Sequence, residues 1–491
     1  MQQRKPNLSS PTTRLRPLLA LSALALSLAG CAQLPALDRQ AVLKPAAEYA
    51  SQQAFAAAEA AWPAERWWTR YADPQLDALI AEALQGSPDM LAAEARLRRA
   101  GAFAQVVGAS SDPQVSANAS ANVQKLSYNH LTPRAITPQG WNDYGRASLD
   151  FGWDLDFWGR NRAGIAAARS QLEASVAERA QARLNLAAAV AAGYADLAQL
   201  FTERDTAEQQ VHIRKQTAKL FDERYRNGLE TRGAVSEARA RLAAADGELL
   251  AADEAIALQR TRLAALLGAG PDRGLGIQRP AVDLATGFAL PANLAADLLG
   301  RRPDVVAARW MAEAQGKLID QKKAEFYPNV NLVAFIGVQS LGLDMLTRSS
   351  SNVGSIGPAI SLPIFTAGRL QGELRGSVAA YEEAVAHYNR TVTQALQDVA
   401  SAGLSQRALA AQRAKAEEAV AAAGDAHRIA RQRYEGGLAN RIEVLYAEDA
   451  LLNARRSLSF LQSRAFTLDV ALQRALGGGY QAGPADTQPN S

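Results

Sequence analysis

Apolar and polar residues alternate strictly between positions 147 and 157. One set of alternate positions carries three carboxylates, Asp150, Asp154 and Asp156. The other set is entirely apolar and consists of Ala147, Leu149, Phe151, Trp153, Leu155 and Phe157. A period of two predicts a β-strand with one apolar and one polar face. The length of about ten residues and the large apolar side chains are typical of a tilted strand in a membrane β-barrel.

Three further segments predict strands, at 113–124, 328–338 and 356–365. Valine and alanine alternate with serine and asparagine in the first of them. In the second, Val333 and Phe335 interrupt the polar face. The prolines of the third suit an edge strand or the rim of a sheet, because proline cannot donate a ladder hydrogen bond. The chain therefore offers four strands, and 128–144 is predicted to be an exposed outer loop.

Long helical segments follow each pair of strands, at 159–268 and 367–477. No proline interrupts Gly159 to Asn227, roughly 68 residues or about 100 Å of α-helix. Beyond the Asn227-Gly228 turn, apolar residues recur every seven positions, at Leu242, Leu249, Ile256 and Leu263. Two helices with heptad spacing and a short glycine turn between them predict an antiparallel coiled-coil hairpin.

The chain repeats itself. Ser87-Pro88-Asp89 recurs 215 residues later as Arg302-Pro303-Asp304, and Arg224-Tyr225 recurs 209 residues later as Arg433-Tyr434. Ordered anchors of this kind indicate a tandem duplication. We therefore predict a first repeat at 73–270, a connector at 271–291, a second repeat at 292–479 and a disordered tail at 480–491. The six-residue change in offset falls between the paired strands, so the first repeat should have the longer outer loop.

The N-terminus predicts secretion and lipidation. Residues 1–30 combine a basic start with the apolar run Leu18 to Leu28, the pattern of a signal peptide. Leu28-Ala29-Gly30-Cys31 resembles the lipobox of bacterial lipoproteins, which predicts lipidation of Cys31 and a tether at 31–72. Cys31 is the single cysteine, so no disulfide forms within the chain. Ala32 after the cysteine suggests sorting to the outer membrane.

Charge and motifs exclude several function classes. The formal net charge is +4, but four of the basic residues lie in the acid-free 1–30 segment, so the mature chain is neutral and nucleic-acid binding is not expected. The four histidines have no metal-ligand spacing, and no glycine-rich phosphate loop occurs. We therefore expect no catalytic residue, no metal site and no cofactor. We also expect that the protein is not an enzyme.

Four strands cannot seal a barrel, because an open sheet edge leaves backbone groups unpaired in hydrocarbon. Two copies give eight strands and three give twelve. A lumen continuous with a tube of helical hairpins favours three. The predicted fold is mainly α with a membrane β-barrel: a twofold internal repeat of strands and antiparallel coiled-coil helices, forming a trimeric twelve-stranded barrel plus an α-helical barrel.

The ordered motifs resemble the TolC-type outer-membrane efflux channels, in the OprM/NodT-like lipoprotein branch that serves multidrug pumps of the RND type. The resemblance spans nearly the whole mature chain and lies in the lipobox at Cys31, 156–160 (DFWGR), 302–305 (RPDV), 327–330 (YPNV), 362–365 (LPIF) with 368–369, and the two Arg-Tyr-x-x-Gly-Leu turns. It implies a homotrimer, anchored in outer-membrane lipid through Cys31 and extending into the periplasm. It also implies a periplasmic adaptor protein and an inner-membrane RND-type transporter as partners.

The resemblance further implies a periplasmic gate at the tips of the helical hairpins. Matched onto the two turns, the gate positions are Glu443, Tyr446, Glu237 and Tyr434. Tyr446 stands where the family usually has an aspartate, so the sequence does not decide whether the gate has a second acidic ring. Three copies of Glu443 around one axis would repel each other and attract cations. The alternative for Glu443 is a solvated charge at a helix end.

Two more groups of residues are candidates. The resemblance places adaptor contacts at the hairpin-tip turns, which contain Gly228, Leu229, Gly437 and Leu438; the alternative for the glycines is that the turn needs a positive φ. Asp150, Asp154 and Asp156 are predicted to face the lumen and attract cations. Their alternative role is pairing with Arg146 or Arg160.

Three functions are consistent with these features. The first is the exit duct of a tripartite efflux pump, which passively conducts small molecules such as drugs to the exterior. The second is the outer-membrane component of a type I protein secretion system, against which the lipobox argues. The third is a structural coiled-coil envelope lipoprotein that conducts nothing, against which the duplicated strands argue. The sequence does not identify the substrate, the partner pump or the resting state of the gate.

Overall fold

The computed structural model describes residues 41–45, 48–49, 55, 59–129, 133–282, 290–291 and 294–482. The predicted signal peptide, Cys31 and most of the predicted tail lie outside these residues. The chain divides into two compact units that cut across the repeats. The strand unit contains 100–172 and 310–386, and the hairpin unit contains 43–99, 173–309 and 387–482. Each unit thus combines matching segments of both repeats.

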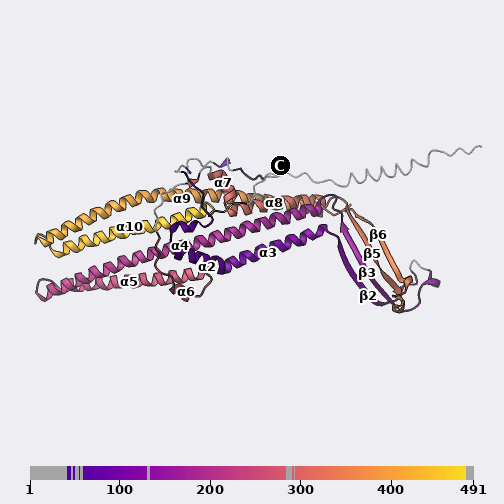
Figure 1. The fold of residues 1–491 in the computed structure, drawn as a ribbon, viewed down its shortest axis with the longest axis horizontal. Coiled ribbons are helices and arrows are strands. Elements are labelled where there is room, and N and C mark those ends of the chain that lie inside the picture. The colour runs from indigo at the N-terminus through magenta and orange to yellow at the C-terminus, as the bar shows by residue number, and fades with distance from the viewer. Residues whose placement is uncertain are drawn as a thin grey trace, which may run out of the picture. The chain divides into compact units, whose positions relative to one another are not determined.

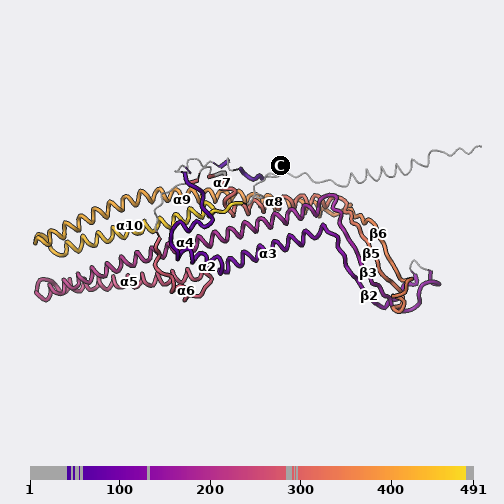
Figure 2. The backbone as a smooth tube through the Cα atoms, in the orientation of Figure 1, coloured from indigo at the N-terminus to yellow at the C-terminus, as the bar shows by residue number. Residues whose placement is uncertain are grey.

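Two long helical hairpins dominate the hairpin unit (Figures 1 and 2). Helix α4 (Arg160–Arg226) is followed by α5 (Arg232–Leu266), and α9 (Arg369–Glu435) is followed by α10 (Arg441–Ala475). The shorter helices are α2 (Pro74–Gly86), α3 (Pro88–Gly108), α6 (Asp272–Leu275), α7 (Leu294–Arg301) and α8 (Pro303–Ala324). Pro74, Pro88 and Pro303 each open a helix, where a missing N–H costs nothing.

The strand unit holds one four-stranded antiparallel sheet in the order β2-β3-β5-β6 (Figure 1). The strands are β2 (Gln114–Gln124), β3 (Asn142–Asp154), β5 (Asn329–Leu341) and β6 (Asn352–Ser361). A two-residue parallel pair in the hairpin unit joins β1 (Glu59–Ala60) to β4 (Leu290–Pro291). The loop 125–141 of the first repeat is longer than the corresponding loop 342–351 of the second.

Two strands end earlier than their alternation predicted. The segment 147–157 was predicted as strand, but β3 spans Asn142–Asp154, because Asp156 adopts a left-handed φ of 44° that turns the chain toward α4. The predicted strand 356–365 was likewise placed too far along the chain, because β6 begins at Asn352 and ends at Ser361. Pro363, which has no N–H for the ladder, follows that end. At the opposite rim, β3 and β5 pair through Tyr144 and Leu341, so part of the predicted outer loop 128–144 is strand.

The register separates the sheet into two faces of opposite character. Residues paired across antiparallel strands share a face. One face is apolar over most of its length on all four strands and carries Val115, Ala117, Ala119, Ala121, Ala147, Leu149, Phe151, Trp153, Leu332, Ala334, Ile336, Ile356, Pro358 and Ile360. The polar residues on this face, Asp143, Ser340 and Asn352, lie at its outer end. The other face carries serine, asparagine, Asp150 and Arg146. Val333 and Phe335 lie on this polar face, where the Arg146 guanidinium stands 5.1 Å from the Phe335 ring centre.

The core of the hairpin unit includes residues that the sequence assigned to a tether. Trp67, Trp68 and Tyr71 are buried, and the rings of Tyr71 and Phe466 meet at 4.6 Å. The prediction of a tether extending to residue 72 was therefore wrong at its C-terminal end, because these aromatics pack into the helical core. Heptad positions such as Leu197 and Leu263 are fully buried in the same core.

The predicted connector 271–291 is also packed against the helices where the structure describes it. Asp73 caps α2 by accepting hydrogen bonds from the amides of Gln75 and Leu76. Its second oxygen accepts from the Tyr194 hydroxyl at 2.7 Å and from the Ala281 amide at 3.0 Å. Burial raises the pKa of Tyr194, so this hydroxyl stays protonated and donates. One carboxylate thus ties α2, α4 and the connector together.

Arg302 performs a related role in the second repeat. Its side chain is nearly buried and contacts Asp304 at 2.6 Å, Asp398 at 3.0 Å and the Ala475 carbonyl at 3.4 Å. These partners belong to α8, α9 and the end of α10. A buried guanidinium needs this many acceptors, because an unpaired buried charge is costly.

By length and composition alone, one helix in the described part of the chain, α4, would suffice to cross a membrane. Its most apolar window is 56% buried inside the protein, as in the core helix of a helical domain. We therefore attach no membrane role to α4.

Candidate functional site

The two hairpin tips are built in the same way. Gly228 and Gly437 adopt φ values of 71° and 74°, and the next amide closes each helix. Leu229 donates to the Arg224 carbonyl at 2.8 Å, and Leu438 donates to the Arg433 carbonyl at 2.7 Å. This is the Schellman arrangement, which satisfies the last carbonyls of a helix and favours glycine at the left-handed position.

The leucines of the tips are not packed. In a Schellman motif the apolar residue after the glycine commonly contacts the last turn of its helix. Here the exposed fraction of Leu229 is 64% and that of Leu438 is 75%. The turn itself requires the glycines but not an exposed leucine. Gly228 and Gly437 therefore meet a structural requirement of the turns. Leu229 and Leu438 add apolar surface that neither hairpin covers.

Glu443 occupies the third position of α10. Asn440 caps that helix by accepting a hydrogen bond from the Glu443 amide at 3.0 Å, just as Thr231 caps α5. An acid there is favoured by the helix dipole. The Glu443 carboxylate also lies 3.5 Å from the Arg433 guanidinium of α9. Both the gate role and the helix-end role remain consistent with this position.

The other predicted gate residues lie nearby on the same helices. Tyr434 is 40% exposed, and the Arg441 guanidinium stands 5.6 Å from its ring centre. Tyr446 is 64% exposed and lies one turn beyond Glu443. Glu237, on the other hairpin, pairs with Arg241 of its own helix. Within one chain, then, Glu443 and Tyr434 each contact an arginine of the α9–α10 hairpin, whereas Glu237 pairs with an arginine of α5.

A contact between the two hairpins was not foreseen from the sequence. The Arg214 guanidinium of α4 lies 2.9 Å from the Asp449 carboxylate of α10, and both side chains are mostly buried. Beside this pair, Ile213, Leu445 and Leu452 form a small apolar cluster. The seven-residue spacing of the two leucines was a signal that was available, but 235 positions separate the charged partners.

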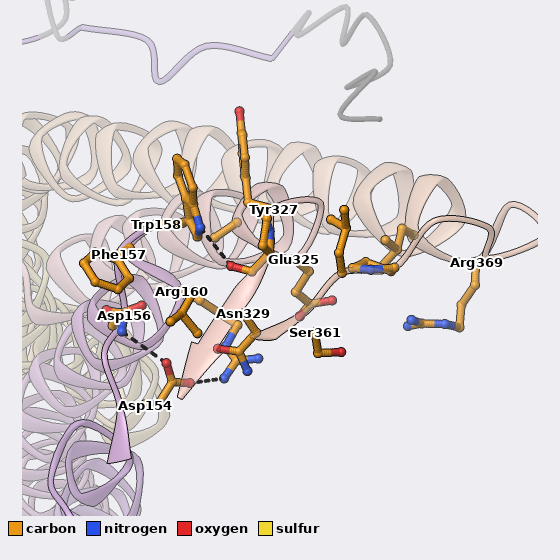
Figure 3. A pocket seen from close by; sticks show the side chains of 16 residues that line it. Asp154, Asp156, Phe157, Trp158, Arg160, Glu325, Tyr327, Asn329, Ser361 and Arg369 are labelled. Atoms are coloured by element: carbon orange, nitrogen blue, oxygen red, sulfur yellow. Dashed lines mark hydrogen bonds and ion pairs between the residues drawn. The ribbon is translucent and has the colours of Figure 1, made fainter. Parts of the chain in front are cut away.

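The three candidate lumen acids have different surroundings. Asp150 lies on the polar face of the sheet and accepts hydrogen bonds from Asn118 and Ser148, both at 2.9 Å. Asp154 forms an ion pair with Arg160 at the start of α4 (Figure 3). Neutral donors thus hold Asp150, whereas a cation compensates Asp154, which matches the pairing alternative for that residue.

Asp156 is not a strand residue, so its predicted place on a polar strand face was wrong. Its carboxylate accepts hydrogen bonds from the amides of Asn161 at 3.0 Å and Arg162 at 2.9 Å. Those amides belong to the first turn of α4, where N–H groups lack partners within the helix. The left-handed turn at Asp156 brings the carboxylate to them. Asp156 therefore caps a helix.

A pocket of 330 Å³ occupies this junction between strands and helices (Figure 3). Trp158 stacks on Tyr327 with ring centres 4.7 Å apart and donates to the Pro328 carbonyl at 2.8 Å. These contacts join the first-repeat segment 156–160 to the second-repeat segment 327–330. The pocket is open and its charged groups are already paired, so we assign it to the joint between the repeats. No cluster of three or more metal-ligating side chains occurs among the described residues.

Comparison with known proteins places this architecture. Residues 79–269 and 294–478 each match the outer membrane efflux protein family model. The multidrug resistance outer membrane protein MdtP of Escherichia coli K12 is 34% identical over 435 residues, covering 87% of this chain and 89% of MdtP. The fusaric acid resistance protein FusA of Burkholderia cepacia is 37% identical, covering 75% and 70%. The crystal structure of the outer membrane protein VceC from Vibrio cholerae is 47% identical with a TM-score of 0.80, covering 86% of this chain and all of VceC.

Proposed function

This chain belongs to the outer membrane efflux protein family, and from that membership we propose how it works as the outer-membrane exit duct of an efflux pump. It is a passive channel, not an enzyme. We infer that three copies form one duct, that a periplasmic adaptor and an inner-membrane RND-type transporter deliver the cargo, and that Cys31 carries a lipid anchor. The observation that carries the proposal is the sheet of the strand unit, which has one face that is apolar except at its outer end, and two edge strands without a partner strand in the described single chain.

The sheet supports closure by identical neighbours. Strands β2 and β6 lie at its edges and run in opposite directions. The β6 edge of one copy can therefore pair with the β2 edge of the next in the same antiparallel pattern. Hydrocarbon tolerates no unpaired edge, so the ring must close. Three copies give twelve strands, within the range of membrane barrels. The apolar face would contact lipid, and the face with Asp150 and Arg146 would line the lumen.

Exposed apolar side chains on the long helices support the same assembly. Leu250 on α5 and Leu404 on α9 are 70% and 60% exposed in the single chain. Val106 on α3 and Phe103 beside it are 71% and 50% exposed. Exposed apolar side chains of this size can be covered by a neighbouring copy. We assign them to packing between neighbouring copies, which would extend the barrel into a tube of helices.

The tips are proposed as the gate and as the adaptor contact. Glu443, with Tyr446 and Tyr434 nearby, would narrow the periplasmic end, and Leu229 and Leu438 would insert into the adaptor. The exposure of both leucines and the charge of Glu443 at a helix start support these roles. Glu237 is the weaker gate residue, because it pairs within α5.

The cargo is proposed to be small and drug-like. MdtP is named for multidrug resistance, and FusA is named for fusaric acid resistance. Export of proteins by a type I secretion system is the second candidate, and the lipobox at Cys31 argues against it. A structural lipoprotein without a pore does not suit a chain of this family.

Copy number and conductance test the proposal together. The mature protein is purified in detergent, its mass is measured by light scattering, and it is then placed in planar bilayers. A trimer with single-channel conductance is expected. A monomer, or a trimer that never conducts even as Glu443→Gln, contradicts the proposal. Drug susceptibility of a strain that lacks the gene, compared with its protein export, separates efflux from secretion.

A further inference from the structure

The loop between β2 and β3 holds two cations on one aromatic ring. The Lys125 ammonium and the Arg134 guanidinium stand 5.6 Å and 5.4 Å from the ring centre of Tyr128. The Tyr128 hydroxyl accepts a hydrogen bond from the Gly140 amide at 2.8 Å, which fixes the ring within the loop. A ring with a cation at this distance is a recognised attractive pair. The loop therefore keeps two positive charges close together despite their repulsion.

The rest of the loop is built to hold this arrangement. The buried Thr137 hydroxyl donates to the Pro133 carbonyl at 3.1 Å. The Gln139 amide group donates to the carbonyls of Arg134 and Thr137 at 3.2 Å and 2.9 Å. These bonds order the backbone around Arg134, so the position of this charge is set by the fold.

The sequence around these two charges contains no acid. The segment from Lys125 to Asn142 contains no aspartate or glutamate. In the described part of the chain, no carboxylate forms an ion pair with either Lys125 or Arg134, and both side chains are exposed. The first acid beyond the loop, Asp143, accepts a hydrogen bond from the Leu343 amide at 2.6 Å. The loop therefore presents an uncompensated basic surface.

Exposed apolar residues flank the cations. Trp141 is 72% exposed, Ile136 is 70% exposed and Leu126 is 40% exposed. The loop begins where the apolar face of the sheet ends, because Gln124 pairs with Asn142 at the last rung between β2 and β3. It lies at the end of the strands opposite to the one that leads into α4. Basic and aromatic side chains next to an apolar band are typical of a membrane interface.

We propose that this loop binds the anionic glycolipid of the outer leaflet, with Lys125 and Arg134 on its phosphate groups and Ile136 and Trp141 against its acyl chains. The inference rests on the proposed function, because that function places this end of the strands at the outer surface. The uncompensated charge matches a phosphorylated lipid, and the apolar flank distinguishes a lipid surface from free phosphate. The bound lipid would anchor the outer rim of the barrel.

Binding of lipid A by the detergent-purified full-length protein tests the proposal, with native mass spectrometry as the readout. The probes are bisphosphorylated lipid A, lipid A stripped of its phosphates, and inorganic phosphate. Each basic residue near an anionic lipid surface contributes about a five-fold factor in affinity, so Lys125→Gln/Arg134→Gln should weaken binding about 30-fold. Lys125→Arg/Arg134→Lys, which keeps both charges, should retain it.

Matched variants separate the sources of binding. Lys219→Gln/Lys415→Gln removes two exposed charges elsewhere and should leave lipid A binding unchanged. Ile136→Ser/Trp141→Ser should weaken binding of the lipid. Three results would overturn the inference. They are equal binding of phosphate-free lipid A, full competition by inorganic phosphate, and unchanged lipid A binding by Lys125→Gln/Arg134→Gln. Conductance of the same preparations in planar bilayers reports separately on the proposed channel, since it persists if only the lipid site is wrong.

Discussion

Gly477 lies so close to Arg301 that a Cβ atom on the glycine would stand 1.9 Å from the Arg301 carbonyl oxygen. The first repeat contains the same contact, because a Cβ on Gly268 would stand 2.6 Å from the Gly86 carbonyl oxygen. Both glycines follow the second helix of a hairpin, and both have positive φ values. The duplication visible in the sequence is therefore also a duplicated packing contact, in which the end of each hairpin packs against the last residue of a shorter helix, α2 or α7.

Replacing Gly477 by alanine should destabilise the protein strongly. Alanine would be strained in the left-handed backbone conformation, and its Cβ would collide with the backbone of Arg301. Together these effects should lower the free energy of unfolding by about 3 kcal/mol or more. Gly247→Ala is the matched control, since that helical glycine has open space around its Cβ position. This substitution should raise the free energy of unfolding by about 0.5–1 kcal/mol. Thermal unfolding of the purified variants measures both. Equal melting temperatures for Gly477→Ala and the unmodified protein would contradict the packing argument.

Breaking the Arg214–Asp449 pair should loosen the link between the hairpins. The pair is mostly buried, so a double-mutant cycle should give a coupling of about 1 kcal/mol. Asp449→Arg should also raise the open probability of the channel in planar bilayers, because it places two cations together. The exchange Arg214→Asp/Asp449→Arg should restore the original open probability. A swap variant as open as the single variant argues that the pair does not hold the hairpins.

Neutralising Glu443 should raise the conductance of the resting channel if this residue belongs to the gate. Glu443→Gln keeps the size of the side chain and the amide that Asn440 caps, so folding should change little. The measurement is single-channel conductance, together with the sensitivity of cells to large antibiotics. Glu237→Gln neutralises a carboxylate of the other hairpin, at the position that corresponds to Tyr446; it is the control and should have a smaller effect. Unchanged conductance in Glu443→Gln would assign this carboxylate to the helix end alone.

A charge at Leu438 should abolish efflux without unfolding the protein. The side chain is 75% exposed, so Leu438→Asp removes little buried surface. Adaptor docking through this leucine predicts a loss of drug resistance in cells at normal protein levels. Leu275→Asp, at a leucine of 73% exposure on α6, should leave resistance intact. The docking role fails if both variants behave alike.

Asp150 and Asp154 should differ in their effect on ion selectivity. Asp150 accepts hydrogen bonds from the neutral donors Asn118 and Ser148 on the polar face, so Asp150→Asn should lower the preference of the channel for cations. Asp154 is compensated by Arg160, so Asp154→Asn should mainly reduce stability. Reversal potentials in a salt gradient measure the first effect, and melting temperatures measure the second. The reverse pattern would place Asp154 in the conducting path instead.

The sequence alone could predict the strands and long helices, because their signals are local and periodic. Strict alternation marks β2 and β3, and unbroken proline-free segments mark α4 and α9. The ends of β3 were missed by a few residues, since alternation continues into the turn at Asp156, where a left-handed backbone breaks the ladder. The end of the tether was placed too late, at residue 72, because alanine-rich composition does not show where packing begins; Trp67 and Tyr71 are already buried.

Tertiary structure alone decided which distant residues meet. The register set Phe335 opposite Asp150 and Val333 opposite Gly152, so these two apolar side chains interrupt the polar face of the sheet. The partners Arg214 and Asp449 lie 235 positions apart, and no local pattern links them. The sequence by itself determined the repeat, the helices, the strands and the family, because these depend on spacing along the chain. The packing of the fold determined which charges are compensated and which stay free to act, because compensation depends on distance in space.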